Sequence, residues 1–280
     1  MNSLKLVDRL VANLSVIITT YNRPAALNVV LAGYYDQKIK PKEILIADDG
    51  STEDTARMIE LWKTRGLPLQ HCWHEDRGFR RSEIINLAIT RVTTPYVVFT
   101  DGDCVPLRNF VADHALYAEK GYVLAGGRVL ASEEFTERLE SGQGSCSHRG
   151  FLFWLKQRLS GNINRLTPLL RLPDSGWRKA SPSDWELVRG CNLSLALDDL
   201  INADGYDESF VGWGYEDSDL AVRLINNGIK IKSLRFAAPM LHLWHREAVK
   251  TTETLNYRLL MDSIRAKRLR ALRGVSVHQR

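Results

Sequence analysis

Short apolar runs alternate with amphipathic stretches along the first half of the chain. Buried-strand patterns, rich in aliphatic and β-branched residues, occupy 14–20, 43–47 and 96–100, and a shorter one occupies 69–73. The stretches between these runs have helical spacing, at 24–34, 53–64 and 82–91. This alternation predicts an α/β fold, with a Rossmann-like, mostly parallel central sheet flanked by helices.

Turn and cap residues support these boundaries. Pro24 suits the first turn of a helix, and Ser51 is placed to cap the helix that begins near Glu53. Beyond Asp103 the pattern is looser. It predicts helices and strands in turn, with helices at 109–120 and 217–227 and strands at 122–130, 190–195 and 230–236.

Three segments of the second half have no strand pattern. Residues 132–185 lack a clear period and are expected to be irregular; their apolar and basic run Phe151–Lys156 is typical of a lid or an acceptor-specific insertion. A loop is expected at 240–245. The tail from about 254 has a helical and basic pattern.

The length of the chain allows one large α/β domain or two small ones. We expect a single domain over residues 1–253, with one half at about 14–130 and a second at about 186–248, followed by a tail at 254–280. The sequence contains no run of about 18 apolar residues, so no membrane-spanning helix is predicted. The first residues lack the apolar core and cleavage site of a signal peptide, so a cytoplasmic protein is expected. The four cysteines are widely spaced, which favours reduced thiols over a zinc site or a disulfide framework.

The net charge of +5 is concentrated towards the end of the chain, where basic residues outnumber acidic ones from Arg246 onward. The tail combines these charges with leucines at helical spacing. Two alternatives stay open: the tail rests peripherally on the inner face of an anionic membrane, or it packs on the domain and exposes its charges. Nucleic-acid binding is not expected, since no reader motif or aromatic-basic interleaving accompanies the charge.

Two aspartates follow the predicted strand at 96–100. Asp101 and Asp103 are separated by Gly102, so both carboxylates can face the same side of an extended segment. Carboxylate oxygens suit Mg²⁺ or Mn²⁺, and open α/β sheets bind ligands at the carboxyl ends of their strands. A plain Asp-Gly turn is the alternative, but its place after a buried strand favours a metal site.

Other polar groups could join this site. Asp49 ends the second predicted strand, and a carboxylate there could accept the imide N–H of a uracil. His242 and His245 flank an apolar pair in the predicted loop and could complete a metal shell. Arg80 lies in a basic run, 77–81, that is either a solvated face or a diphosphate contact.

The densest acidic cluster is Glu216, Asp217 and Asp219, preceded by Gly212-Trp213-Gly214. Carboxylates in a first helical turn gain from the helix dipole, so capping explains part of the cluster. Capping does not explain the tryptophan between two glycines. Tryptophan stacks on the C–H face of a sugar, and a carboxylate beside it can take a proton from a hydroxyl.

These motifs, in this order, resemble a known family. Residues 15–23 (SVIITTYNR), followed by 48–51 (DDGS) and 101–103 (DGD), resemble the family 2 glycosyltransferases of GT-A fold. Residues 189–192 (RGCN) through 210–217 (FVGWGYED) are similar to the galactosyltransferase region shared by β-1,4-galactosyltransferases, polypeptide GalNAc-transferases and bacterial chondroitin polymerase. The likeness covers roughly residues 14 to 248.

The resemblance implies a UDP-sugar donor, a divalent metal ion (Mn²⁺ or Mg²⁺) and a glycan or lipid-linked glycan acceptor. It makes residues of about 14–130 a nucleotide-sugar half and those of about 186–248 a smaller, acceptor-binding half, and it assigns residues to three tasks. Nucleotide contacts fall on Thr19, Tyr21, Arg23, Asp49 and Asp101, with Arg80 near the diphosphate; metal contacts on Asp101, Asp103 and His245 or His242; acceptor contacts on Trp213, Glu216 and Asp219. Asp217 is the implied general base. Tyr215 stands where the family commonly has glycine, which would narrow the acceptor pocket.

One positioned base without a carboxylate nucleophile implies a single displacement with inversion. The predicted function is therefore metal-dependent, inverting transfer of a hexose or N-acetylhexosamine in surface polysaccharide or lipopolysaccharide synthesis. A catalytically inactive nucleotide-sugar or carbohydrate-binding protein of the same fold is the main alternative. A nucleotidyltransferase would be expected to have a glycine-rich phosphate loop near the N-terminus, which this sequence lacks.

Overall fold

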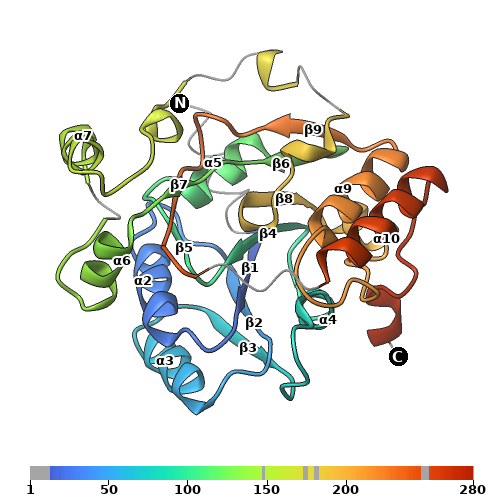
Figure 1. Ribbon diagram of the computed structural model, residues 1–280, viewed down its shortest axis with the longest axis horizontal. Coiled ribbons are helices and arrows are strands. Elements are labelled where there is room, and N and C mark those ends of the chain that lie inside the picture. Colours follow the sequence, from blue (N-terminus) through green and yellow to red (C-terminus); the bar gives the residue numbers. More distant parts are fainter. Residues whose placement is uncertain (1–12, 147–148, 173–175, 180–182, 247–251, 280) are drawn as a thin grey trace.

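The computed structural model describes residues 13–146, 149–172, 176–179, 183–246 and 252–279 (Figure 1). A seven-stranded sheet forms its centre. The strand order is β3 (Leu69–Trp73), β2 (Glu43–Asp48), β1 (Leu14–Thr20), β4 (Tyr96–Asp101), β8 (Leu193–Ala196), β6 (Tyr122–Ala125) and β9 (Lys230–Ser233). Neighbouring strands pair in parallel except where β8 runs antiparallel to β4 and β6, so the mostly parallel sheet predicted from the sequence is confirmed.

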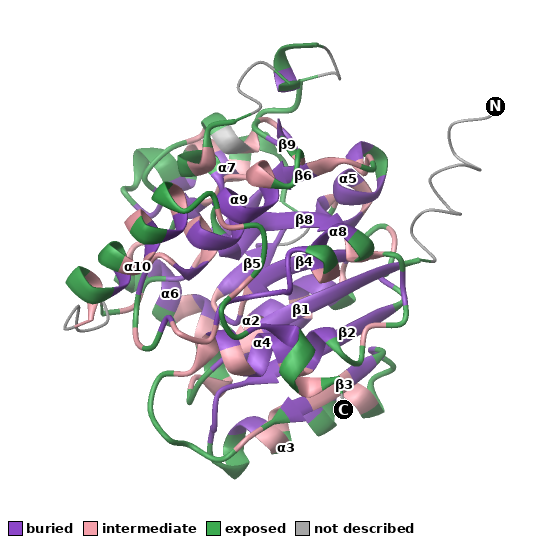
Figure 2. Ribbon diagram, turned by 90° about the vertical axis from the view of Figure 1, so that its right-hand side faces the viewer, coloured by how far each residue is buried: buried purple, intermediate pink, exposed green. Residues whose placement is uncertain are grey.

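Helices cover both faces of this sheet because its strands are apolar on both sides. Along β1, Val16 and Ile18 belong to one buried cluster and Ile17 to the other. The first cluster lies under α2 (Pro24–Tyr35), α3 (Glu53–Thr64) and α5 (Phe110–Tyr117), and the second lies under α4 (Arg81–Ile89), α8 (Leu197–Asn202) and α9 (Glu216–Asn226). Figure 2 shows the strands as the buried interior and the outer turns of the helices as exposed.

A second, smaller sheet has the order β5 (Cys104–Pro106), β10 (Met240–His242) and β7 (Val129–Leu130). It joins the ends of segments that are far apart in the sequence. The predicted strand at 122–130 is wrong as one element: it divides into β6 and β7, in different sheets, at Gly126 and Gly127. A β-carbon at Gly126 would overlap the side chain of Asn192, so only glycine fits this crossing.

Other local expectations need correction. Ser51 does not cap α3; its Oγ instead accepts the Asn22 N–H at 2.8 Å, and Thr52 occupies the N-cap position. The predicted loop at 240–245 begins with strand β10, and the predicted strand at 190–195 begins with a 3₁₀ turn over Gly190–Asn192.

The segment 132–185 is not irregular throughout. It contains α6 (Glu133–Glu140) and α7 (Phe151–Leu159), besides 3₁₀ turns at Thr167–Leu169, Gly176–Lys179 and Trp185–Leu187. Ser132 starts α6 by accepting the Phe135 N–H. Two-turn helices of this length give too short a pattern to detect from apolar spacing.

The tail packs on the domain. Helix α10 (Glu253–Arg265) lies on α9 and buries Leu260, and a final 3₁₀ turn, Val275–His278, places Val275 in the core cluster beneath α4. Of the two alternatives for the tail, these contacts show packing on the domain. None of the described helices is long and apolar enough to cross a bilayer.

Candidate active site

The carboxyl ends of β1 and β4 meet at Asp101. Thr19 and Asp101 are partners in the ladder, and the Thr19 hydroxyl donates to Asp101 Oδ1 at 2.8 Å. The following turn is pinned to β1, since Gly102 N–H donates to the Thr19 carbonyl at 2.7 Å. A β-carbon at Gly102 would lie 2.9 Å from Thr20 Oγ1. The sheet therefore fixes the direction in which Asp101 and Asp103 leave the strand.

Asp103 faces both predicted metal histidines. Its Oδ1 is 3.6 Å from His242 Nε2 and its Oδ2 is 3.5 Å from His245 Nε2. Strand β10 creates this approach, because His242 pairs with Cys104 in register and Leu243 N–H donates to the Asp103 carbonyl at 2.8 Å. The structure thus brings together three of the four residues that the resemblance assigned to the metal, and Asp101 is near enough for its charge to act on His242.

The chemistry of these donors fits a divalent cation. His245 Nδ1–H donates to the Arg246 carbonyl at 2.9 Å, so the other ring nitrogen, Nε2, is the one that faces the Asp103 carboxylate. Burial lowers the pKa of His242, although Asp103 opposes the shift, so this ring is neutral and able to act as a ligand. Burial raises the pKa of the neighbouring Cys104 thiol well above its usual value, which makes it a poor ligand.

Arg23 lies on the metal side of the site. Its Nη1 donates to Asp103 Oδ2 at 3.2 Å, and its Nη2 donates to Glu140 Oε1 at 3.0 Å and to the Trp244 carbonyl at 3.3 Å. The helix end that carries Glu140 is therefore connected to the site through one guanidinium. The nucleotide contact that the resemblance implies for Arg23 stays a prediction.

The other nucleotide candidates lie at the ends of β1 and β2. Tyr21 is about half exposed, and its hydroxyl donates to Asp76 Oδ2 at 2.9 Å. Asp49 is buried, with Oδ1 2.7 Å from His74 Nε2 and Oδ2 accepting the Arg80 N–H at 2.9 Å. Burial raises the pKa of Asp49, and the His74 hydrogen bond opposes this.

The Arg80 side chain has partners within its own loop and helix. Its Nη1 donates to Glu83 Oε2 and its Nη2 to the Glu75 carbonyl, both at 2.9 Å. Arg77 is largely exposed and pairs with Glu75. Within the described part of the chain, neither guanidinium forms an ion pair with Asp101, Asp103 or Asp217.

Arg81 is the residue of this basic run that reaches the site. Its guanidinium is 13% exposed, lies over the Tyr206 ring and contacts three carboxylates. Nη2 is 3.0 Å from Asp101 Oδ1, and Nη1 is 3.2 Å from both Glu216 Oε1 and Asp217 Oδ1. One largely enclosed cation therefore joins Asp101, at the end of β4, to Glu216 and Asp217, at the start of α9. Sequence reasoning missed this role, although the arginine run was the signal.

Asp217 is fixed from the other side by Gly190. Its Oδ2 accepts the Gly190 N–H at 2.9 Å, and the carboxylate remains 25% exposed. This exposure leaves room for a hydroxyl to approach, as a general base requires.

Glu216 is more enclosed. Burial raises its pKa to about 7, and the charge of Asp217 adds to the shift while Arg81 opposes it. Two adjacent carboxylates thus differ in environment, and Asp217 is the more accessible of the two.

The remaining acceptor candidates have different positions. Trp213 is 38% exposed, in the loop before α9. Asp219 is fully buried and forms a 2.7 Å ion pair with Arg223, so the prediction that it contacts an acceptor is corrected: its side chain holds α9 from within. Tyr215 has a left-handed backbone, with φ of 71°, and its ring packs on Tyr257 of α10. Glycine adopts this left-handed conformation without strain, which is a physical reason why the family commonly has glycine where this chain has Tyr215.

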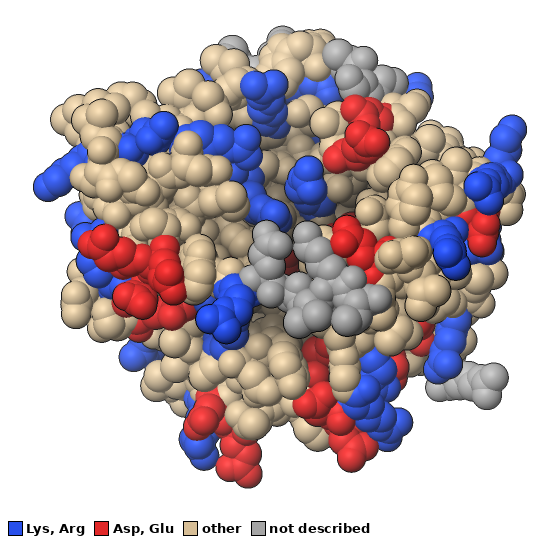
Figure 3. Space-filling view, in the orientation of Figure 1, with Lys and Arg blue, Asp and Glu red and all other residues tan. Residues whose placement is uncertain are grey.

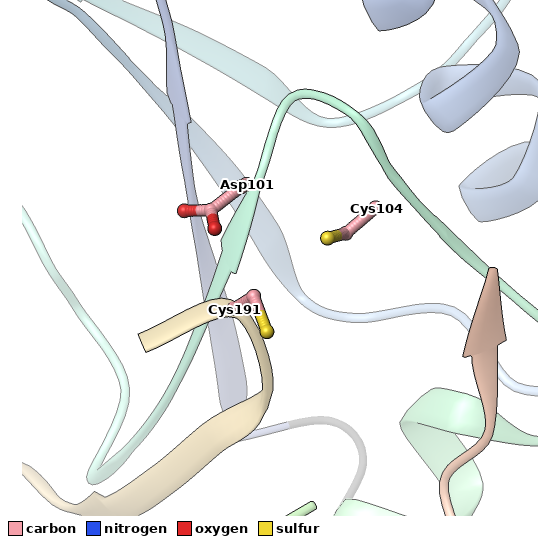
Figure 4. Close-up of side chains that lie close together, drawn as sticks. All are labelled: Asp101, Cys104 and Cys191. Atoms are coloured by element: carbon pink, nitrogen blue, oxygen red, sulfur yellow. The ribbon is translucent and has the colours of Figure 1, made fainter. Parts of the chain in front are cut away.

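Two cysteines adjoin the site (Figure 4). Cys104 and Cys191 converge on Asp101, with ligand atoms all within 4.8 Å of one another. Arg128 Nη1 is 3.1 Å from Cys191 Sγ, and hydrogen bonding from Cys104 together with this charge lowers the pKa of Cys191. All four cysteines are free and buried. Nothing in the spacing of the cysteines indicates that two of them meet.

Two family models cover most of this architecture. Residues 15–172 match glycosyl transferase family 2, and residues 177–246 match a model described as the N-terminal domain of galactosyltransferase. The chain belongs to glycosyltransferase family 2. The first match includes Asp49, Asp101 and Asp103, and the second includes Asp217 and both histidines.

Relatives of this glycosyltransferase include polysaccharide synthases. It is 27% identical to hyaluronan synthase of Pasteurella multocida, over 79% of this chain and 24% of that protein. It is 25% identical to chondroitin synthase of Escherichia coli (81% and 34%) and 28% identical to validoxylamine A glucosyltransferase of Streptomyces hygroscopicus subsp. limoneus (77% and 48%). The chain spans about a quarter to a half of the length of these relatives.

Solved glycosyltransferases share the fold. S. aureus TarS 1-349 in complex with UDP-GlcNAc matches with a TM-score of 0.60 at 17% identity, over 95% of this chain and 69% of that one. The mannosyltransferase PcManGT from Pyrobaculum calidifontis, in complex with GDP-Man and Mn²⁺, matches with a TM-score of 0.56 at 17% identity, over 91% and 62%. The GT-A fold implied by the sequence is confirmed.

Proposed function

We propose that this glycosyltransferase transfers a hexose or N-acetylhexosamine from a UDP-sugar to a hydroxyl of a glycan acceptor, with inversion and with a divalent metal ion. One observation carries the proposal. Arg81 holds Asp101, at the end of β4, and Asp217, at the start of α9, on the same guanidinium. A donor held at the carboxyl end of the sheet would then present its sugar to the exposed carboxylate of Asp217.

In this proposal, metal binding and proton transfer are carried out by different residues. Asp103, His242 and His245, with Asp101 beside them, would hold Mn²⁺ or Mg²⁺, whose chemistry is to neutralise a diphosphate leaving group. Asp217 would take the proton of the acceptor hydroxyl as that oxygen attacks the anomeric carbon. The carbon–oxygen bond to the diphosphate breaks as the new glycosidic bond forms, so the configuration inverts.

Substrate classes rest on the comparisons. The complex of TarS with UDP-GlcNAc supports a UDP-sugar, whereas PcManGT carries GDP-Man on the same fold, so the nucleotide must be tested. Hyaluronan and chondroitin synthases among the relatives support a polysaccharide or lipid-linked glycan as acceptor, in surface polysaccharide or lipopolysaccharide synthesis. Trp213 would supply the stacking surface for the acceptor sugar.

A donor screen tests the proposal. UDP-Gal, UDP-Glc, UDP-GalNAc, UDP-GlcNAc and GDP-Man are incubated with the protein, with Mn²⁺ or with a chelator, and nucleotide release is measured. We expect release from one UDP-sugar that depends on the metal. Release from GDP-Man alone would refute the UDP assignment. Binding of a UDP-sugar without turnover, with or without oligosaccharide acceptors, would instead indicate the inactive binding protein.

A further inference from the structure

Helix α7 projects from the sheet at the edge of the molecule, at the left in Figure 1. It belongs to an insertion that is closed at its base by backbone hydrogen bonds from Ser132 to Asn162 and from Asn164 to Leu130, at 2.9 and 3.1 Å. Its inner side is anchored by Trp154 and Gln157, which are buried. The helix therefore has a fixed orientation and a defined outer side.

The outer side is apolar. Leu152 and Leu159 are each 79% exposed, the highest values among the large hydrophobic side chains that the structure describes, and Phe151 is 54% exposed. Leu152 and Leu159 are seven residues apart, so they share one face of the helix. A folded chain gains nothing in water by presenting two leucines in this way, which indicates a contact surface.

Cations accompany these side chains. Lys156 lies one turn from Leu152, on the same face, and Arg158 lies seven residues from Phe151. Residues 141–173 contain no aspartate or glutamate and five basic residues, Arg149, Lys156, Arg158, Arg165 and Arg171. Figure 3 shows Lys and Arg side chains over the region where Figure 1 places α7.

The exposed leucines and the cations around them indicate which kind of partner α7 contacts. A helix face with protruding leucines and flanking cations, without acidic residues, matches the interface of an anionic bilayer: the apolar tips enter the acyl boundary and the cations remain at the headgroups. The neighbouring helix α6 is acidic on its surface: a hollow beside Ser160–Asn162 is lined by the exposed Glu133, Glu134 and Glu137. Because anionic headgroups would repel these carboxylates, the contact with a bilayer is limited to α7 itself.

Helix α10 is a poorer candidate for this contact. Its exposed Leu255 and Tyr257 share the helix with Glu253 and Asp262, and its inner face is packed on α9. We propose that α7 docks the protein on anionic phospholipid membranes, with Leu152 and Leu159 as the inserted residues. The insertion that carries α7 also contacts the site, through Glu140 and Arg23, so docking would place the site beside the bilayer.

Vesicle binding tests the proposal. The full chain is sedimented with phosphatidylcholine vesicles that contain or lack phosphatidylglycerol. We expect binding to the anionic vesicles that weakens with salt. The double variant Leu152→Glu/Leu159→Glu should reduce the partition coefficient at least about tenfold, because it loses two apolar contacts and adds two repelled charges. The double variant Lys156→Glu/Arg158→Glu should reduce only the part of the vesicle binding that depends on phosphatidylglycerol.

A matched variant, Leu255→Glu/Leu272→Glu, alters two exposed leucines of the tail, 59% and 60% exposed, and should bind as the unaltered chain does. Equal thermal unfolding of all variants shows that each one is folded. The proposal is overturned if the unaltered chain ignores anionic vesicles or if the α7 variants bind them undiminished. The proposal is also overturned if the unaltered chain self-associates and the α7 variants lose only this self-association, as measured by their sedimentation coefficients. In that case α7 would contact a second copy of the protein and not a membrane.

Discussion

The carboxylate of Asp217 rests directly on the α-carbon of Gly190. The Gly190 N–H donates to Asp217 Oδ2 at 2.9 Å, and a β-carbon at position 190 would overlap the carboxylate. Twenty-seven residues separate the two along the chain. The proposed base is thus oriented by a backbone group, on a segment that leads straight into strand β8 of the central sheet.

Gly190→Ala should displace Asp217 without removing it. The added methyl group forces the carboxylate away from its donor, and a misplaced base costs roughly 10²-fold in turnover. We expect kcat for transfer to fall while the affinity for donor and Mn²⁺ is kept. Gly127→Ala is the control, since a β-carbon there would meet no atom within 4 Å. Equal turnover of the two variants would show that the Gly190 contact does not position the base.

The sequence predicted the surroundings of Asp101 and Asp103 more completely than those of Asp217. Asp101 and Asp103 follow a buried run, and the end of a parallel strand is a place that local pattern reveals. The contact between Gly190 and Asp217 depends on how α9 packs against the end of β8, which no local pattern encodes. Helix α7 was missed as a helix because nine residues give too short a pattern, and because its exposed face carries leucines while Gln157 is buried.

Asp217→Asn tests the base by chemistry rather than position. The amide oxygen can still accept the Gly190 N–H, so the fold and donor binding should be nearly unchanged. Loss of proton acceptance should reduce turnover by roughly 10²–10⁴-fold. Transfer kinetics with saturating donor measure this effect, and thermal unfolding verifies the fold. Turnover close to that of the unaltered protein would exclude Asp217 as the base.

Asp103→Ala should abolish the Mn²⁺-dependent part of UDP binding, measured by calorimetry. Either His242→Ala or His245→Ala should weaken Mn²⁺ binding roughly tenfold or more, because both Nε2 atoms face Asp103 at similar distances. Glu140→Gln is the control: it removes the other carboxylate bound by Arg23 but no metal donor. If Glu140→Gln weakens Mn²⁺ binding as much as Asp103→Ala does, the effect arises through Arg23 and not through a metal site.

Glu216 should make stability depend on pH. Its folded pKa of about 7 exceeds the ordinary 4.5, so between these values the folded state holds a proton that the unfolded state has lost. Stability from this group is therefore complete below about pH 4.5 and is lost as the pH rises to about 7. Denaturant unfolding of the unaltered protein and Glu216→Gln should give a stability difference that moves in favour of the variant between pH 5 and pH 8. A difference that is constant over this range would contradict the raised pKa.

Arg81 cannot be told from Arg77 and Arg80 in the sequence, because all three belong to one basic run. Only the fold shows that α4 begins at Arg81 and turns this side chain inward. The neighbouring guanidiniums contact glutamates and backbone of their own segment, whereas Arg81 compensates the carboxylates on both sides of the site. Its substitution should therefore affect stability as well as activity.

Arg81→Gln should destabilise the protein by about 1.5–3 kcal/mol, because the enclosed Glu216 and the partly exposed Asp101 and Asp217 lose the charged donor that they share. Arg77→Gln, which alters an exposed member of the same run, should change stability by no more than about 0.5 kcal/mol. Denaturant unfolding measures both. Arg81 lowers the pKa of Asp101, so its loss favours protonation of that carboxylate, and the Arg81 variant should regain stability relative to Arg77→Gln as the pH is lowered from 8 to 5. Equal stability of the two variants at every pH would mean that Arg81 does not hold the two halves of the site together.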